Sequence, residues 1–243
     1  QLCVGTHALL TEDVEFKNLA LVITDEQHRF GVAQRAALAA KGNRPHILIM
    51  SATPIPRTLA LIIYGDLDVS IIDELPPGRQ KVDTFAVGSA YRKRINNFIR
   101  RLTGEGRQVY VVCPRIEEGE DLNDGLMSAE EHASELQREF PDLRVDCVHG
   151  RMKAREKDAI MSAFAAGDID ILVSTTVIEV GVDVPNATVM VIESAERFGL
   201  SQLHQLRGRV GRGGEQSYCI LMSGEKLSRE SRARLEAMCE TND

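Results

Sequence analysis

The sequence lacks several features that would assign it at once to a class of protein. Its net charge is −7, so no global positive field draws the chain to nucleic acid, and any such contact needs a local basic patch. Its five cysteines are far apart and lack metal-ligand spacing, which indicates reduced thiols of a cytosolic compartment. No apolar run approaches the roughly 20 residues that span a membrane, and no signal peptide is evident.

The chain has 243 residues, enough for one large domain or two of ordinary size. A hydrophobic content of 43% is sufficient for a packed core. The sequence begins with Gln1 rather than Met, and we therefore expect it to be a fragment.

Short apolar runs alternate with helical patterns, which predicts an α/β fold built on parallel sheets. Two prolines and a glycine in Glu74–Arg79 predict a boundary between domains. Strands are predicted at 19–24, 46–50, 82–87, 109–113, 145–148, 171–174, 187–192 and 217–221. Helices are predicted at 32–40, 57–64, 91–102, 128–140, 152–164 and 203–212.

Polar side chains follow the first two predicted strands. The run 19–24 is apolar throughout, as in a parallel strand buried on both faces, and it ends in Asp25 and Glu26. An aspartate at the carboxyl end of such a strand can hold Mg2+, and the glutamate can activate water. An ordinary acidic turn is the alternative. Ser51 and Thr53 follow the second strand and can bond these carboxylates or cap a helix.

The segment Leu203–Arg212 is predicted to form a short helix with one apolar stripe. Arg209 and Arg212 are three residues apart, so they would share one helix face. Two guanidinium groups side by side suit an anion with several oxygens, and phosphate is the obvious one. A solvated basic helix end is the alternative.

A second polar segment runs from Thr175 to Pro185 after the predicted strand 171–174. The hydroxyls of Thr175 and Thr176 can bind a phosphate of a nucleic-acid backbone. Gly181 permits a tight bend, and Asp183 can accept a hydrogen bond, for instance from a ribose hydroxyl. A loop that glycine and proline merely shape is the alternative.

The order of these segments resembles the motor region of superfamily 2 helicases, and in particular the RecG family of bacterial branched-DNA helicases. The long forms of motif II and of Gly65–Arg79 are its most specific parts, and Gln27 separates it from the related Mfd translocases, which usually have Asp-Glu-Glu-His in motif II. The resembling segments are Gly5–Leu9 (motif Ib), Asp25–Val32 (II), Ser51–Ala60 (III), Val109–Glu118 (IV), Val148–Gly150, Ile171–Pro185 (V) and Gln205–Arg212 (VI).

The resemblance implies two RecA-like parallel-sheet domains of the P-loop NTPase type, the first one incomplete. The implied limits are 1–78 for the first domain, 79–225 for the second and 226–243 for the start of a helical hairpin. It implies ATP and Mg2+ as cofactors, and branched double-stranded DNA, such as stalled forks and Holliday junctions, as the partner. It also implies a cytoplasmic bacterial monomer that acts in recombination and repair, with single-stranded DNA-binding protein as a further partner.

The resemblance also implies roles for single residues. Asp25 would hold Mg2+ and Glu26 would orient the attacking water. Arg209 and Arg212 would reach the γ-phosphate with support from Gln205. The remaining implied residues are Gly181 and Asp183 at the nucleotide, Gln27, His28, Ser51 and Thr53 in coupling, and Thr6, His149, Thr175 and Thr176 at DNA.

One departure from the helicase pattern limits this interpretation. The sequence contains no Gly-x-x-x-x-Gly-Lys-Ser/Thr stretch, the loop that cradles the β- and γ-phosphates of a nucleotide. We therefore expect a longer parent protein to be the enzyme and this chain alone to be inactive. Two alternatives stay open: an Mfd-type translocase that acts on RNA polymerase, and a non-catalytic relative that binds nucleic acid.

Overall fold

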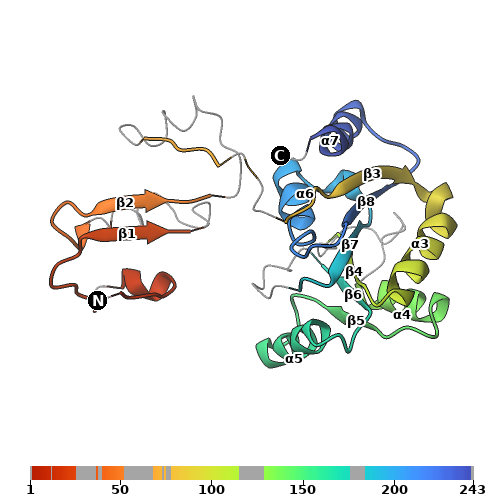
Figure 1. Cartoon of the computed structure of the whole chain (residues 1–243), viewed down its shortest axis with the longest axis horizontal. Coiled ribbons are helices and arrows are strands. Elements are labelled where there is room, and N and C mark those ends of the chain that lie inside the picture. The colour runs from red at the N-terminus through yellow and green to blue at the C-terminus, as the bar shows by residue number, and fades with distance from the viewer. Residues whose placement is uncertain are drawn as a thin grey trace. The chain divides into compact units, whose positions relative to one another are not determined.

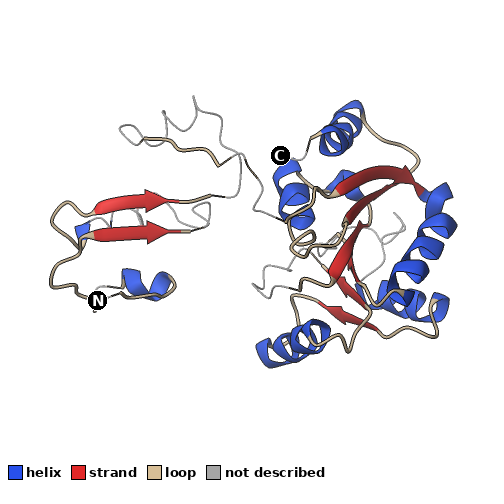
Figure 2. Ribbon diagram, viewed as in Figure 1, coloured by secondary structure: helices blue, strands red, loops and turns tan. Residues whose placement is uncertain are grey.

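The structure is a computed structural model in which the chain divides into two compact units, Gln1–Val69 and Ser70–Asp243 (Figures 1 and 2). The predicted domain limits at 78 and 225 stay a prediction. The structure describes residues 2–11, 13–25, 37, 40–51, 68–72, 74, 78–114, 129–175 and 184–241.

The second unit is built on a six-stranded sheet in the order β3-β8-β7-β4-β6-β5, and every pairing in it is parallel (Figure 1). This sheet confirms the predicted α/β class. Because all strands run in the same direction, their carboxyl ends lie at one edge of the sheet. The strands are β3 (Asp83–Gly88), β4 (Gln108–Val112), β5 (Val145–Val148), β6 (Ile171–Ser174), β7 (Ala187–Ile192) and β8 (Tyr218–Ser223).

Helices cover both faces of this sheet, and the central strands β4, β6 and β7 are therefore buried along their whole length and mostly apolar. In β4, Tyr110 and Val112 face one hydrophobic cluster, while Val109 and Val111 face the other. Side chains of α5, α6 and α7 pack into the first cluster and those of α3 and α4 into the second. The helices are α3 (Arg92–Gly104), α4 (Ala129–Glu139), α5 (Ala154–Ala165), α6 (Leu200–Arg207) and α7 (Arg229–Glu240).

Local sequence explains where these helices lie. Ile95, Ile99 and Leu102 recur at helical spacing in α3 and are buried. Tyr91, predicted to belong to the same stripe, is 50% exposed because it ends the short 3-10 helix η3 (Ser89–Tyr91) before α3 begins. At α7, Ser228 caps the helix by accepting a hydrogen bond from the Ser231 amide. None of the helices in the described ranges has the length and hydrophobicity needed to cross a bilayer.

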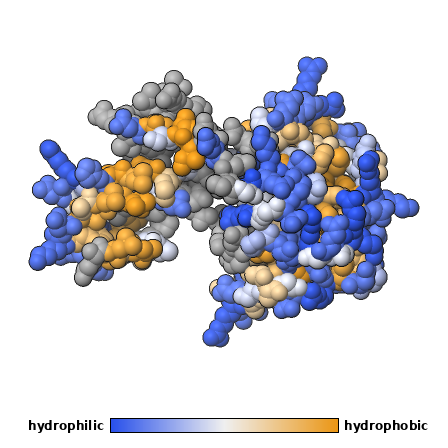
Figure 3. All heavy atoms as spheres, viewed as in Figure 1, coloured by the Kyte–Doolittle hydropathy of each residue, from blue (hydrophilic) through white to orange (hydrophobic). Residues whose placement is uncertain are grey.

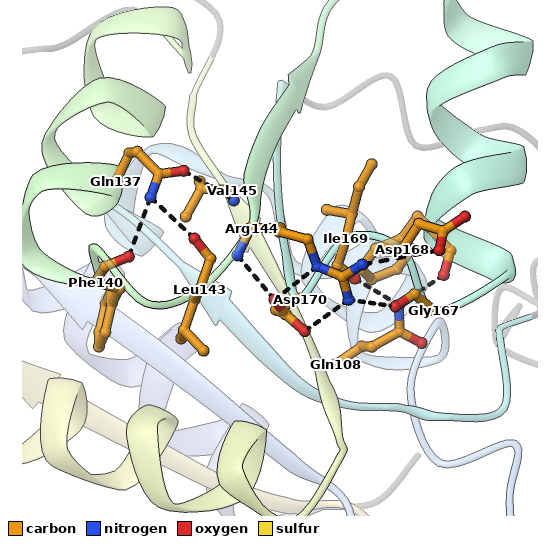
Figure 4. A network of polar contacts seen from close by, with 11 residues as sticks. Gln108, Gln137, Phe140, Leu143, Arg144, Val145, Gly167, Asp168, Ile169 and Asp170 are labelled. Carbon is orange, nitrogen blue, oxygen red and sulfur yellow. Dashed lines mark hydrogen bonds and ion pairs between the residues drawn. The ribbon is translucent and has the colours of Figure 1, made fainter.

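A polar network holds the amino ends of the strands together, at the edge of the sheet opposite His149 and Thr175 (Figure 4). The buried Gln108 side chain donates from Nε2 to the carbonyl oxygens of Phe164, at 2.6 Å, and Ile169, at 2.7 Å. Arg144 binds Asp170 through its backbone amide, at 2.8 Å, and through its guanidinium group. These contacts fix the turn between α5 and β6 to the sheet.

The described part of the first unit contains a parallel pair, β1 (Leu21–Thr24) and β2 (His46–Ile49), and the 3-10 helix η1 (His7–Leu10). The prediction of a strand buried on both faces is wrong for β1, where Val22 and Thr24 are buried but Leu21 and Ile23 are about half exposed. Figure 3 shows hydrophobic side chains at the surface of this unit. The β2 strand is likewise mostly exposed rather than buried.

Candidate functional site

The arginines of the predicted phosphate site lie in a turn after α6 rather than within a helix. The predicted helix 203–212 is wrong at both ends, because α6 begins at Leu200 and ends at Arg207. Gly208 caps the helix, and the chain continues in short turns such as the bond from the Arg209 amide to the Leu206 carbonyl, 3.0 Å. Gly211 has a φ of 78°, a left-handed conformation that ends the helical path.

This turn, residues 208–214, is anchored by apolar side chains and presents its polar ones to solvent. Leu203, Leu206 and Val210 are buried, as the predicted stripe required. Arg209 is half-buried, whereas Gln205 and Arg212 are exposed. Arg212 Nε donates to the Gly208 carbonyl at 3.4 Å. Buried apolar side chains therefore hold the turn in place, and its arginines give it a positively charged surface that suits the binding of a phosphate.

The predicted DNA contacts of the second unit meet at the carboxyl edge of the sheet. Val148 pairs with Ser174 in the β5–β6 ladder, so His149 and Thr175, the next residues of each strand, emerge side by side. His149 Nε2 lies 2.7 Å from Glu130 Oε1 at the start of α4. The Ser174 hydroxyl is buried and has no hydrogen-bond partner among the described residues. This edge therefore combines hydroxyl and imidazole groups with a carboxylate from a neighbouring helix.

A buried charged cluster at the same edge was missed by sequence analysis. Glu193 directly follows β7 and accepts two hydrogen bonds from the Arg92 guanidinium group, at 2.6 and 2.5 Å. His132 Nε2 of α4 lies 3.4 Å from the same carboxylate. Burial of Glu193 opposes ionisation, but the bonds from Arg92 and His132 outweigh it and lower the pKa of Glu193 to about 2. The available signal was an acidic residue directly after an apolar strand, as at Asp25.

Arg207 is a second residue that sequence analysis did not assign. Its side chain is buried, and its Nη1 donates to the carbonyl oxygens of Met238, at 3.0 Å, and Thr241, at 2.6 Å, at the carboxyl end of α7. A cation suits this position because the last carbonyls of a helix carry partial negative charge. Arg207 lies four residues after the buried Leu203, and this spacing could have placed it on the buried face of the helix.

In the first unit, the described site residues lie at the carboxyl ends of β1 and β2. Asp25 follows Thr24, whose carbonyl accepts a hydrogen bond from the Met50 amide at 2.8 Å, and Ser51 is the next residue. The parallel pairing thus brings Asp25 and Ser51 to the same edge, as predicted, and both are exposed. Thr6 precedes η1, is exposed, and makes no side-chain cap to that helix.

Several predicted site residues lie outside the described residues. They are Glu26, Gln27, His28, Thr53, Thr176, Gly181 and Asp183. The roles assigned to all site residues, described or not, remain predictions. Across the described ranges, no group of three or more His, Cys, Asp or Glu side chains is arranged to hold a metal ion.

Comparison with known proteins shows the family to which this chain belongs. The helicase conserved C-terminal domain family matches residues 91–214, about half of the chain, which cover β4 to β7, α6 and the 208–214 turn. The chain therefore belongs to this helicase family. A Saccharomyces cerevisiae Dbp5 structure bound to RNA and ADP BeF3 superposes with a TM-score of 0.63 over 96% of this chain and 60% of its own, at 15% identity, which supports the fold alone.

Relatives that are more similar in sequence are helicases of one kind, RecG. The ATP-dependent DNA helicase RecG of Synechocystis sp. is 58% identical over 100% of this chain and 29% of its own length. RecG of Escherichia coli (strain K12) is 54% identical over 100% of this chain and 36% of its own length. A RecG structure bound to a three-way DNA junction has a TM-score of 0.76 and 50% identity over 99% of this chain and 30% of its own.

These findings confirm the predicted resemblance to the C-terminal motor region of RecG. The chain spans about a third of the length of these relatives.

Proposed function

We propose that this chain is the C-terminal part of the motor of an ATP-dependent DNA helicase that remodels branched DNA. The observation that carries the proposal is the 58% identity with a RecG helicase over the entire chain. The relatives named above are RecG helicases, which favours remodelling of DNA branches over displacement of RNA polymerase. Retention of both the acidic and the arginine motifs favours an enzyme over a non-catalytic relative.

Within this proposal, Arg209 and Arg212 bind the γ-phosphate, and Gln205 supports them. ATP supplies the phosphoanhydride bond that is broken, and charge accumulates on the phosphoryl oxygens as it breaks. Arg212 is exposed on an anchored turn, so its guanidinium group can meet that charge without reorganisation of the backbone. Gly181 and Asp183 would contact the nucleotide in the same reaction.

Residues of the first unit would hold Mg2+ and orient the attacking water. Asp25 offers one exposed carboxylate at a strand end, which fits Mg2+ because this ion usually keeps several waters and takes one or two carboxylates with substrate phosphates. Glu26 would orient the attacking water. ATP binding and hydrolysis would be coupled to DNA binding through Gln27, His28, Ser51 and Thr53.

DNA would be contacted through the carboxyl edge of the second sheet and through Thr6 of the first unit. His149 and Thr175 emerge side by side there, and Thr176 follows. Hydroxyl and imidazole groups bind phosphates without reading base sequence, which suits an enzyme that acts on junction shape. We also propose a monomer in the bacterial cytoplasm, with single-stranded DNA-binding protein as a further partner.

A chimeric enzyme tests the proposal, because the chain contains no phosphate loop of its own. In Synechocystis RecG, the aligned 242-residue segment is replaced by this chain, and ATP hydrolysis is measured with forked and linear duplex DNA. We expect fork-stimulated hydrolysis and fork regression without RNA polymerase. A folded chimera that displaces stalled polymerase but leaves forks unchanged would support the Mfd-type alternative. One that binds forks without hydrolysing ATP would support a non-catalytic role.

A further inference from the structure

The backbone on both sides of Arg212 is pressed against other segments of the second unit. Gly211 is buried, and a Cβ atom built on it would lie 2.7 Å from Val82 Cγ2. A Cβ atom on Gly213 would lie 2.8 Å from the Pro185 carbonyl oxygen, closer than real Cβ atoms approach. Gly214, the next residue, has nothing within 4 Å of such an atom. The two glycines that flank Arg212 are therefore places of close approach, and their neighbour is not.

The segment 79–82, which leads into β3, is hydrogen-bonded to the same turn from a great distance in sequence (Figure 1). Arg79 Nε donates to the Gly211 carbonyl oxygen at 2.9 Å, and Gln80 Nε2 donates to the Gly214 carbonyl oxygen at 2.9 Å. In the opposite direction, Gln216 Nε2 donates to the Lys81 carbonyl oxygen at 2.9 Å.

The bond from Arg79 has a particular consequence, because the Gly211 carbonyl belongs to the peptide unit that contains the Arg212 amide. A peptide unit is planar, so holding its oxygen also fixes the direction in which the Arg212 Cα leaves the turn. The Arg79 side chain is half-buried, and its bond is charge-assisted, which makes it stronger than a bond between neutral groups.

We infer that Arg79 is a positioning residue for Arg212, and that Gly213 against Pro185 restrains the same turn from the other side. The inference rests on the proposed function, in which Arg212 binds the γ-phosphate. Arg79 lies in the segment of the second unit that precedes β3, and Pro185 ends the segment Thr175–Pro185. The placement of Arg212 thus depends on the segment that leads into β3 and on the end of a predicted DNA-contact segment.

The test uses the chimeric RecG described above and compares Arg79→Ala with Lys81→Ala, an exposed residue of the same segment. A misplacement of about 1 Å can cost on the order of 10²-fold in rate. We therefore expect Arg79→Ala to lower kcat for fork-stimulated ATP hydrolysis about 10- to 100-fold. The KM for ATP and the Kd for forked DNA should stay within about twofold. Lys81→Ala should match the unsubstituted chimera.

A double substitution separates positioning from a general structural role. If Arg79 acts through Arg212, Arg79→Ala should cause no further loss in a chimera that already carries Arg212→Ala, because the two effects are not additive. Additive losses, or a normal kcat for Arg79→Ala, would overturn the inference. Inactivity of the unsubstituted chimera would instead overturn the proposed function and the inference together.

Adjacent glycines provide an independent check that leaves every charge in place. Gly213→Ala should lower kcat, because the new methyl group must push the turn away from the Pro185 carbonyl. Gly214→Ala should have no effect. Equal activity of the two variants would contradict the restraint at Gly213. Thermal unfolding of each variant of the 243-residue chain verifies that the fold is retained.

Discussion

Replacing Glu193 with Gln should destabilise the second unit in a pH-dependent way. The carboxylate has a side-chain exposure of only 12% and is bound by Arg92 and approached by His132. Burial opposes ionisation, but the hydrogen bonds from Arg92 and the nearby His132 outweigh it and lower the pKa of Glu193 from 4.5 to about 2. Since each pKa unit corresponds to 1.36 kcal/mol, the ionised carboxylate contributes about 3 kcal/mol to the free energy of unfolding at pH 7.

The sign of the pH dependence follows from the direction of this pKa. A lowered pKa means that the stabilisation is fully present above about pH 4.5 and is lost as the pH falls toward 2. The difference in unfolding free energy between the unsubstituted chain and Glu193→Gln should therefore shrink from about 3 kcal/mol at pH 7 to about 1 kcal/mol at pH 3.

Urea unfolding at the two pH values measures this difference, and hydrogen exchange of β7 amides assigns the transition to the second unit. Asp142→Asn is the matched control, because Asp142 pairs with Arg100 at 2.8 Å but is 59% exposed. An exposed pair contributes at most about 1 kcal/mol. A difference for Glu193→Gln that is equal at pH 7 and pH 3 would refute the assignment of this stabilisation to the ionised carboxylate.

Three further predictions concern other parts of the second unit. Gln108→Leu should cost about 1 to 3 kcal/mol in urea unfolding, because the Ile169 carbonyl loses its side-chain donor and the Phe164 carbonyl keeps only backbone donors such as the Gly167 amide; a cost below about 0.5 kcal/mol would contradict this. Burial raises the pKa of the Cys113 and Cys219 thiols to about 12, so mass spectrometry should find both protected from alkylation at pH 8 while the exposed Cys3 reacts; equal rates would count against the packing of β4 and β8. Arg207→Ala should accelerate hydrogen exchange in α7 at least tenfold relative to α3, because two carbonyls at the end of α7 lose their donor, whereas unchanged exchange in α7 would show that Arg207 does not hold it.

The strands of the second unit were predictable because each is a short apolar run between polar turns. Strands β5, β6 and β7 were predicted at their observed bounds, and β4 within one residue. A strand that helices cover on both faces is apolar at successive positions, so its burial can be predicted from its residues alone, as for Val109–Val112. The exposure of β1 was not predictable in this way, because it depends on which other segments cover that face.

The site was predictable only as far as local sequence determines it. Arg209 and Arg212 were found from their spacing, but α6 ends at Arg207, before either of them, and Gly208 caps it. The Arg79–Gly211 bond joins residues 132 positions apart, and the Arg92–Glu193 bonds join residues 101 apart. Contacts between residues so far apart in the chain cannot be predicted from the periodicity of the sequence.

The central claim is that Arg212 stabilises the charge that develops when ATP is hydrolysed. The most direct measurement is kcat for fork-stimulated ATP hydrolysis by the RecG chimera carrying Arg212→Ala, beside Arg232→Ala, an exposed arginine of α7. Loss of an arginine of this kind should lower kcat on the order of 10³-fold or more, with fork binding unchanged and Arg232→Ala fully active. Normal hydrolysis with weakened fork binding in Arg212→Ala would contradict the claim and make Arg212 a DNA contact.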